Sequence, residues 1–279
     1  MILVTGANGQ LGSDVCSELK QKNISFIPCD IDSLDITNKE SVFDFFNNND
    51  ISAVIHCAAY TAVDKAEEDF KTCLKVNVYG TMYLAECCNE KNIKILYVST
   101  DYVFGGEGTV PFETTDEISP INYYGKSKFM GEVAVKELCK KYFIVRTSWV
   151  FGEKNTNFIH TMLKLSETRD FVNVVCDQNG SPTYSKHLAK LLCEIIETEK
   201  YGTYHATNEG FCSWYELAKK VFEIAKKETK VFPVTSDQYK TAAKRPHNSR
   251  LSKKSLVENG FRQLPLWEDA VKEYLNNIF

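Results

Sequence analysis

The 279-residue sequence predicts an α/β fold built on a doubly wound parallel sheet, and three observations support this. Short apolar runs alternate with amphipathic stretches through the first half of the chain. The first apolar run, 2–4, leads directly into a glycine-rich turn and then an amphipathic stretch. After residue 150 the alternation gives way to shorter elements. We therefore expect a Rossmann-type dinucleotide-binding domain over 1–150. A smaller mixed α/β substrate-binding region should follow over 151–279, and some of its segments could return to the main sheet.

Composition and charge argue against two classes of partner. The chain is 43% hydrophobic and 25% charged, the balance of a globular protein with a proper core. Its net charge is −4 and no long run carries one sign, so we expect no nucleic-acid partner. No apolar run approaches ~18 residues, so we expect no membrane span. Residues 1–6 lack the basic segment and cleavage site of a signal peptide, which favours a cytoplasmic protein.

The ten cysteines suggest a metal or disulfide framework by their number but not by their spacing. Most have apolar neighbours, no pair forms a Cys-x-x-Cys motif, and Cys87 and Cys88 are adjacent. Free cysteine packs as a small hydrophobe. We expect structural thiols in a reducing cytoplasm and no bound metal.

The glycine turn 6–12 predicts a site for a dinucleotide. Gly6, Gly9 and Gly12 would supply a tight turn, a close backbone approach to a pyrophosphate, and close helix–strand packing. The helix expected over 11–22 would then offer free N–H groups and a positive dipole end to the phosphates. The alternative is an ordinary turn between a strand and a helix.

Asp30 ends the second expected strand, 25–29, and predicts how the adenosine ribose is held. An acid about 20 residues after the glycines commonly binds the ribose hydroxyls. No Lys or Arg occurs between Lys22 and Lys39, so a 2′-phosphate would meet acidic side chains without a basic partner. We therefore expect NADH to be preferred over NADPH. The alternative is that Asp30 merely ends a strand.

The next elements continue the alternation. A capping box at 37–40 predicts a helix to about residue 46. His56 falls inside a strand, where we expect a packed and hydrogen-bonded histidine and not a ligand. Further strands are expected over 53–59, 93–98 and 143–147, and a long helix containing Asn77 and Gly80 is expected over 69–91.

Thr100, Asp101 and Tyr102 leave the carboxyl end of the strand 93–98, which is the edge where ligands bind in open α/β sheets. Thr100 is thus placed to donate a hydrogen bond to a substrate carbonyl. The long loop 105–122 follows, and long loops in compact domains are often functional.

Tyr124 and Lys128 are four residues apart, so they share one face of the helix that follows this loop. A nearby ammonium favours the phenolate and would lower the tyrosine pKa from its usual ~10. Such a pair can give a proton to a carbonyl oxygen or take one from a hydroxyl. The same spacing also fits two solvated neighbours on a helix surface.

The second half predicts elements that are shorter and less regular. Arg245 lies in a polar loop, from which it could meet a phosphate. A capping box at 213–216 predicts a helix to about residue 227. Other helices are expected over 158–166, 186–197 and 266–278, and strands over 173–176 and 203–206.

Together these motifs resemble a known family. The turn Gly6-x-x-Gly9-x-x-Gly12, Thr100, and Tyr124-x-x-x-Lys128 resemble the extended short-chain dehydrogenase/reductase superfamily. Longer strings narrow the resemblance to the dTDP-4-dehydrorhamnose reductase family, and it covers essentially the whole chain. These strings are 58–67, 99–104, 146–150 and Arg245-Pro246-x-x-Ser249-x-Leu251. Members of that family reduce a 4-keto sugar nucleotide, dTDP-4-dehydro-6-deoxy-L-mannose, to dTDP-L-rhamnose with NADH or NADPH.

The resemblance implies a role for each matching residue. Tyr124 would be the proton donor, Lys128 would bind the nicotinamide ribose and lower the Tyr124 pKa, and Thr100 would polarise the C4 carbonyl. Thr100, Asp101, Trp149 and, less securely matched, Arg245 would contact the dTDP-sugar substrate, and a homodimer is a possible assembly. The residues implied in cofactor binding are Gly6, Gly9, Gln10, Leu11, Gly12, Asp30, Asp35, Ile36, Ala58, Ala59, Thr61, Tyr124 and Lys128.

Two alternatives share the fold. One is a sugar-nucleotide epimerase or dehydratase that keeps its NAD bound; such a dehydratase usually follows the threonine with Asp-Glu, whereas Thr100 is followed by Asp101-Tyr102. The other is a non-catalytic nucleotide-binding subunit, such as the regulatory subunit of methionine adenosyltransferase. A binding module need not keep Thr100, Tyr124 and Lys128 together, so their presence favours the reductase.

Overall fold

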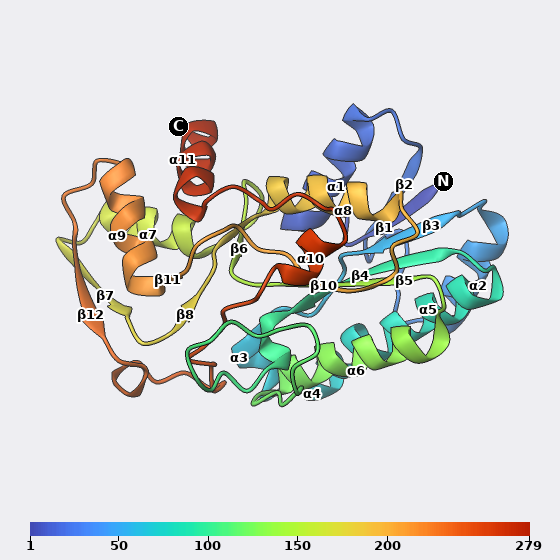
Figure 1. Ribbon diagram of the computed structural model, residues 1–279, viewed down its shortest axis with the longest axis horizontal. Coiled ribbons are helices and arrows are strands. Elements are labelled where there is room, and N and C mark those ends of the chain that lie inside the picture. The colour runs from blue at the N-terminus through green and yellow to red at the C-terminus, as the bar shows by residue number, and fades with distance from the viewer.

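The central element of the computed structural model, which describes residues 1–279, is a six-stranded parallel sheet (Figure 1). Its strand order is β10-β5-β4-β3-β1-β2. The order reverses next to β1, between β1 and β3, and this switch point is where ligands bind in doubly wound sheets. The predicted fold class is confirmed. The strands are β1 (Ile2–Thr5), β2 (Phe26–Cys29), β3 (Ala53–His56), β4 (Lys94–Thr100), β5 (Tyr142–Thr147) and β10 (Gly202–His205).

Helices cover both faces of this sheet because the strands β1 to β5 carry apolar side chains on both sides. On β4, Leu96 packs with one layer of helices, whereas Ile95 and Tyr97 pack with the other. The first layer holds α1 (Gln10–Gln21) and α8 (Ser185–Ile196). The second holds α2 (Lys39–Asn48), α5 (Thr81–Glu90) and α6 (Tyr123–Leu138).

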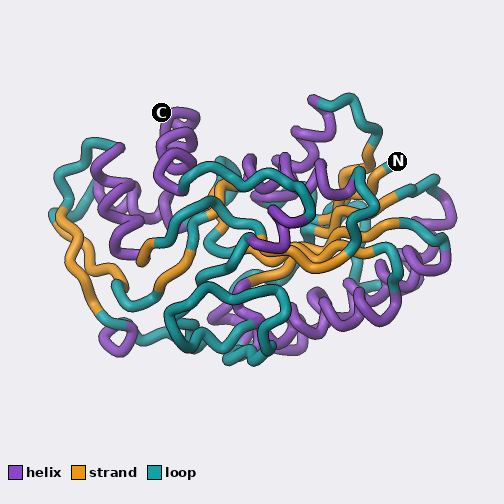
Figure 2. Tube along the Cα trace, in the orientation of Figure 1, coloured by secondary structure: helices purple, strands orange, loops and turns teal.

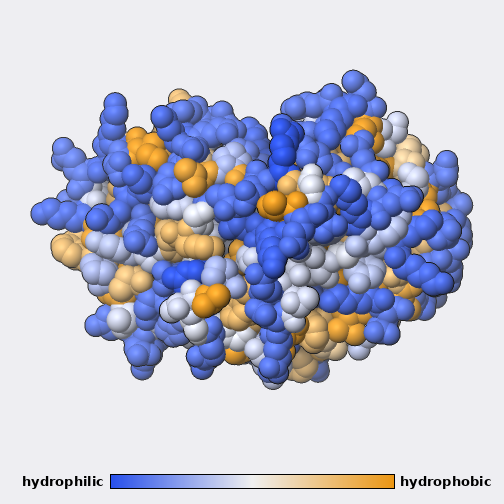
Figure 3. Space-filling model, in the orientation of Figure 1, coloured by the Kyte–Doolittle hydropathy of each residue, from blue (hydrophilic) through white to orange (hydrophobic).

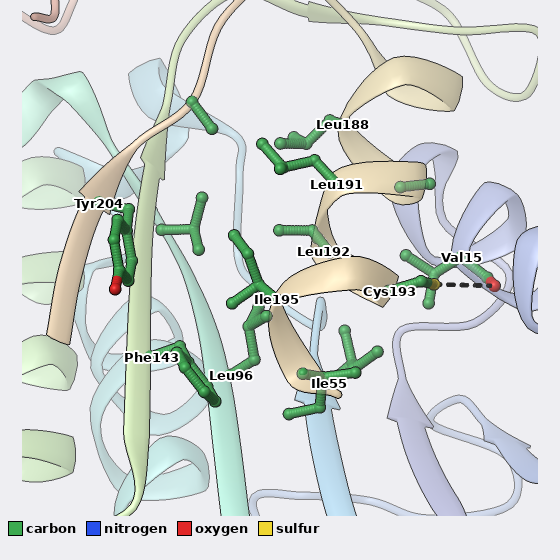
Figure 4. Packing of buried hydrophobic residues seen from close by; sticks show 14 of the residues in the cluster. Val15, Ile55, Leu96, Phe143, Leu188, Leu191, Leu192, Cys193, Ile195 and Tyr204 are labelled. Atoms are coloured by element: carbon green, nitrogen blue, oxygen red, sulfur yellow. Dashed lines mark hydrogen bonds between the residues drawn. The ribbon is translucent and has the colours of Figure 1, made fainter. Parts of the chain in front are cut away.

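The helix α8 shows how the second half of the chain completes the sheet. Its side chains Leu188, Leu192 and Ile195 point toward the strands (Figure 4). All three are fully buried, and each such burial contributes roughly 1.5–3 kcal/mol. The strand β10 pairs in parallel with β5, so it forms the outer strand of the sheet.

The remaining second-half elements form a smaller core of their own, beside the sheet in Figure 1. Its buried centre includes Trp267, Val271 and Tyr274. The helices are α7 (Phe158–Ser166), α9 (Trp214–Ile224) and α11 (Trp267–Ile278), and α10 (Lys254–Glu258) lies against β10. Three short two-stranded sheets complete the region: β7 (Phe171–Val175) with β12 (Lys230–Val234), β8 (Asn179–Gly180) with β11 (Cys212–Ser213), and β6 (Val150–Phe151) with β9 (Thr183–Tyr184).

Two local predictions were wrong in detail. The helix α2 is capped by Asn38, whose side chain accepts the Ser41 N–H, because the Thr37 hydroxyl donates to Asp35 instead. The long helix expected over 69–91 is interrupted. It consists of α4 (Phe70–Leu74), the π-helical turn η1 (Lys75–Gly80) and α5. The capping box at Ser213 is confirmed, since Ser213 and Glu216 bond reciprocally.

The surface seen in Figure 3 is mostly polar and the cysteines are mostly buried, as the packing of the core leads one to expect. The face seen in Figure 3 is mostly hydrophilic, with hydrophobic residues scattered among polar ones. All ten cysteines are free thiols, and most are buried. No three side chains of His, Cys, Asp or Glu are grouped in a way that could hold a metal ion. None of the helices has the length and apolarity needed to cross a bilayer.

Candidate active site

A single cavity of about 910 Å³ lies where the carboxyl ends of the central strands meet the second half of the chain. Every residue predicted to bind cofactor or substrate lines it, with the exception of Arg245. The structure therefore brings together groups that are as far apart in sequence as Gly6 and Trp149. Residues of α7 and α9, which the sequence did not indicate, close the other side.

The glycine turn has the geometry that a bound pyrophosphate needs. Gly6 has φ +65°, and a Cβ there would lie 2.7 Å from the Cα of Ala58. A Cβ on Gly12 would strike the Gly6 carbonyl. Gly9 caps α1 without any side-chain bond, so the first N–H groups of this helix remain free to face anionic oxygens. The turn thus fits a dinucleotide.

Asp30 is fixed against this turn. Its two carboxylate oxygens accept the backbone N–H groups of Asn8, at 3.0 Å, and Ile31, at 2.9 Å. Lys128 is the only Lys, Arg or His that lines the cavity. The Asp30 end of the cavity therefore offers hydroxyl acceptors and no cation for an additional phosphate.

Tyr124 and Lys128 lie on α6, which begins where the Asn122 side chain accepts the Gly125 N–H at 2.8 Å. Lys128 Nζ donates to the Val98 carbonyl at 2.7 Å and lies 4.0 Å from the centre of the Tyr97 ring. Burial lowers the pKa of Lys128 to about 7. Burial also raises the pKa of Tyr124, and a hydrogen bond with Thr100 only partly offsets this.

The prediction that Lys128 lowers the Tyr124 pKa is therefore wrong for this arrangement. The ammonium is directed at a backbone carbonyl and an aromatic face, and burial dominates the behaviour of the phenol. The phenol still carries its proton at neutral pH, as a donor must, although a raised pKa makes it a weaker acid.

Thr100 links the phenol to a buried acid. Its hydroxyl donates to Asp101 at 3.0 Å and accepts the Tyr102 N–H at 3.2 Å. Asp101 is 3% exposed, and burial raises its pKa to about 7. A hydroxyl, a phenol and a carboxyl group thus converge where a carbonyl oxygen and its neighbouring hydroxyls could sit.

Trp149 stands at the junction with the second half of the chain. Its φ of +49° is unusual for a bulky residue, and such strain persists only where the surroundings impose it. The ring stacks on Trp214, with centroids 3.7 Å apart, and Phe158 packs on Trp214 at 4.6 Å. The capping box at Ser213 places Trp214 at the start of α9, but nothing in the sequence indicated that it would meet Trp149.

Arg245 does not reach the cavity lining. Its guanidinium pairs with Asp64 through bonds of 2.6 Å and 3.1 Å. Asp64 also accepts the Ala243 N–H at 3.0 Å. The side chain therefore ties its own loop to α3 (Val63–Ala66), and it is not free to meet a phosphate in this arrangement.

Asn77 explains the π-helical turn. Its side chain accepts the Tyr60 N–H at 2.8 Å and donates to Ser127 Oγ at 2.9 Å. Ser127 in turn donates to the Tyr124 carbonyl at 2.8 Å. The π turn thus places one amide between the loop after β3 and the helix that carries Tyr124.

Comparison with known proteins gives a consistent result. A family model described as the RmlD substrate binding domain matches residues 1–279. The dTDP-4-dehydrorhamnose reductase of Aggregatibacter actinomycetemcomitans is 42% identical, over 97% of this chain and 97% of that protein.

Solved structures agree. A dTDP-4-dehydrorhamnose reductase from Clostridium acetobutylicum superposes with a TM-score of 0.97 at 42% identity, covering 99% of each chain. One from Bacillus anthracis, in complex with NADP, has a TM-score of 0.96 at 41% identity. That match covers 99% of this chain and 98% of the other.

Proposed function

The chain belongs to the RmlD substrate binding domain family, that of the dTDP-4-dehydrorhamnose reductases, and on this premise we propose that it reduces a 4-keto sugar nucleotide. The substrate we propose is dTDP-4-dehydro-6-deoxy-L-mannose, and the product is dTDP-L-rhamnose. The observation that carries the proposal is the convergence of Thr100, Tyr124 and Lys128 on one cavity with the glycine turn.

The chemistry divides between cofactor and protein. When bound, the nicotinamide supplies the hydride to the substrate C4. Tyr124 protonates the developing alkoxide at O4, which is possible because its phenol carries a proton at neutral pH. The Thr100 hydroxyl, which donates to Asp101 in this structure, would turn to the same oxygen and polarise it. Lys128 would hold the nicotinamide ribose beside it.

NADH is the cofactor that we propose as preferred. Asp30 suits two ribose hydroxyls, and the cavity offers a 2′-phosphate no cation near that residue. The relative from Bacillus anthracis was solved with NADP, so the family includes a member that binds the phosphorylated form. Steady-state kcat/KM values with each cofactor test the proposal, and an equal or higher value with NADPH contradicts it.

The sugar nucleotide would lie between the two halves of the chain. We propose residues 1–150 as the part that binds the dinucleotide and residues 151–279 as the part that completes the substrate site. Asp101 and Thr100 would meet sugar hydroxyls, and the stacked rings of Trp149 and Trp214 would offer a flat apolar surface. We further propose that the protein acts in the cytoplasm as a homodimer.

The decisive experiment follows NADH absorbance with the proposed substrate beside other 4-keto sugar nucleotides. A reductase consumes one equivalent of NADH per product. An epimerase or dehydratase recycles its cofactor, and a regulatory subunit turns nothing over. Steady consumption that is fastest with dTDP-4-dehydro-6-deoxy-L-mannose supports the proposal. Product without net NADH consumption contradicts it.

A further inference from the structure

We infer that Glu132 is a positioning residue for the reduction: paired with Arg146, it fixes the helix that carries Tyr124 and Lys128 against the ends of β4 and β5. The inference rests on the proposed function, because it concerns how those two groups work in the reaction.

The ion pair of Glu132 and Arg146 is buried and tightly bonded. Glu132 and Arg146 have exposed fractions of 0% and 1%. The guanidinium forms a bidentate fork, with Nε 2.8 Å from Oε1 and Nη2 2.7 Å from Oε2. The Ser99 hydroxyl donates to the same carboxylate at 2.6 Å.

Stability alone gives little reason for such a pair. Removing two charges from water costs several kcal/mol each, and apolar residues of similar volume often stabilise a core at least as well. The core on this face of the sheet is otherwise built of residues such as Leu84, Val135 and Ile144. A charged pair in this apolar layer therefore suggests that its geometry or its charge is used.

The geometry points at the reacting groups. Ser99 and Arg146 face each other across the β4–β5 ladder. Ser99 lies between Val98, whose carbonyl holds Lys128, and Thr100, whose hydroxyl lies at the cavity. The Glu132 carboxylate on α6 therefore fixes the end of β4. This strand end supplies the Val98 carbonyl that binds Lys128 and the Thr100 hydroxyl that lies at the cavity.

Arg146 extends the same constraint outward. Its Nη1 donates to the Thr114 carbonyl at 3.3 Å, in the long loop before α6, and lies 3.4 Å from His205 Nε2 on β10. The loop that precedes Tyr124 is thus held by the same side chain. This loop runs as irregular chain along the lower edge of the molecule in Figure 2.

The negative charge of Glu132 also acts on Lys128, which lies one turn earlier on the same helix. Among the groups around Lys128, the Glu132 carboxylate is the strongest influence raising its pKa against burial, and the thiols of Cys57 and Cys73 follow. His56 on β3 is neutral because burial and Lys128 lower its pKa, and Tyr97 on β4 presents its ring face. Tyr124 lies one turn earlier on α6 itself. Glu132 is therefore the nearby carboxylate that opposes the loss of this charge.

The first test is Glu132→Gln, which keeps the shape and removes the charge. In the proposed role of Lys128 the charged ammonium holds the ribose, so activity should fall as pH rises through the Lys128 pKa. The variant should lower that pKa and move the alkaline limb of the kcat/KM profile down by roughly 1 pH unit. The misplaced helix should lower kcat by at least ~10-fold. The kinetic values are taken per folded molecule, after thermal melting has measured the folded fraction.

Glu209→Gln is the matched control. Glu209 forms an ion pair of 3.6 Å with the nearly buried Lys253, away from this cavity. The Glu209→Gln substitution removes the same charge from a partly buried ion pair. We expect it to leave both the alkaline limb of the kcat/KM profile and kcat unchanged. A limb that moves equally in both variants overturns the inference, since a general change in charge would explain it.

Ser99→Ala is the second variant, and it keeps the test decisive if Glu132→Gln does not fold. It removes one bond to the carboxylate and leaves both charges in place. We expect kcat to fall by roughly 3-fold, as expected for one lost buried hydrogen bond, with the limb unmoved. If the variants only melt earlier, with wild-type kcat and an unchanged profile, the pair is merely structural and the inference is wrong.

A failure of the proposed function is distinguishable from a failure of this inference. If the wild type reduces no 4-keto sugar nucleotide, the proposed function fails. NADH affinity, measured by fluorescence across pH, then still reports on Lys128. The inference is supported if Glu132→Gln binds NADH more weakly and loses this binding at a lower pH than the wild type does, while Glu209→Gln does neither. Identical NADH binding in both variants contradicts it.

Discussion

The two walls of the cavity are built differently. The cofactor wall, defined as the glycine turn 6–12, Asp30 and the loop 58–61, uses backbone groups and small residues that closely follow β1, β2 and β3. The aromatic wall, defined as Trp149, Phe158 and Trp214, uses large side chains from three separate segments. Backbone cradles need missing side chains as well as particular φ angles, whereas the aromatic wall is held mainly by ring packing, with a positive φ at Trp149 alone.

This difference indicates how each wall should respond to change. A cradle of tight backbone contacts has no spare volume, so one added methyl group disrupts it. A stack of rings can adjust, so a smaller ring loses contact area but keeps the surface. Substitutions in each wall, a change of pH, and a substitution of the proposed proton donor test that contrast.

The largest effect is expected at Tyr124, where the walls meet. Tyr124→Phe removes the proposed proton donor and should lower kcat by a factor of about 10²–10⁴, with NADH affinity retained. Stopped-flow measurement of NADH oxidation checks the loss of turnover, and titration by NADH fluorescence checks that the affinity is retained. Near-normal turnover would remove Tyr124 from the mechanism.

The second largest effect is expected for a substitution in the cofactor wall. Gly6→Ala places a Cβ 2.7 Å from the Ala58 Cα at a φ of +65°, and strain plus overpacking should weaken NADH binding by roughly 30-fold or more. Gly108→Ala is a matched control, since Gly108 has φ +76° but nothing within 4 Å of the added Cβ. Isothermal titration with NADH measures both. Equal losses in the two variants would show that backbone strain, and not the close approach, is responsible.

Acid should destabilise the sheet that supports the cofactor wall. Burial lowers the pKa values of His56 and His205 to about 3, so both are neutral in the folded protein. In the unfolded chain they bind protons below about pH 6.5. Stability should therefore fall as pH drops, by roughly 2 kcal/mol for each histidine between about pH 7 and about pH 5. Urea unfolding at the two pH values measures the change, and His56→Gln should reduce it. A loss that is the same in this variant would mean that His56 does not contribute.

The smallest effect is expected on the aromatic wall. Trp214→Phe keeps a ring beside Trp149 but loses stacking area worth roughly 1 kcal/mol. The KM for the sugar nucleotide should rise roughly 5-fold, while the KM for NADH stays unchanged and serves as the internal control. A rise in both KM values would place Trp214 outside the substrate site.

The sequence predicted the cofactor wall because its signals are local. Gly6, Gly9 and Gly12 follow a strand in one unbroken stretch, and their spacing carries the geometry. The strands, their order of appearance and most helices were predictable for the same reason. The π turn was not, because it depends on Asn77 reaching both Tyr60 and Ser127, which no window along the helix contains.

The aromatic wall and the charged pair were missed because they depend on contacts between distant segments. Trp149 and Trp214 are 65 positions apart in the chain and meet only in the folded protein, where their rings stack. The helical spacing of Lys128 and Glu132 is visible in the sequence, but the burial that directs Lys128 at the Val98 carbonyl is not. That burial is also why the expected lowering of the Tyr124 pKa was wrong.

The position of β10 has a consequence for protein engineering. A fragment cut after residue 150 would lack the outer strand of its sheet and the helix α8 that covers one face. It would expose the unpaired edge of β5 and a wide apolar surface, and both promote aggregation. A chimaera that exchanges the nucleotide-binding half with that of a relative must therefore carry α8 and β10 with it.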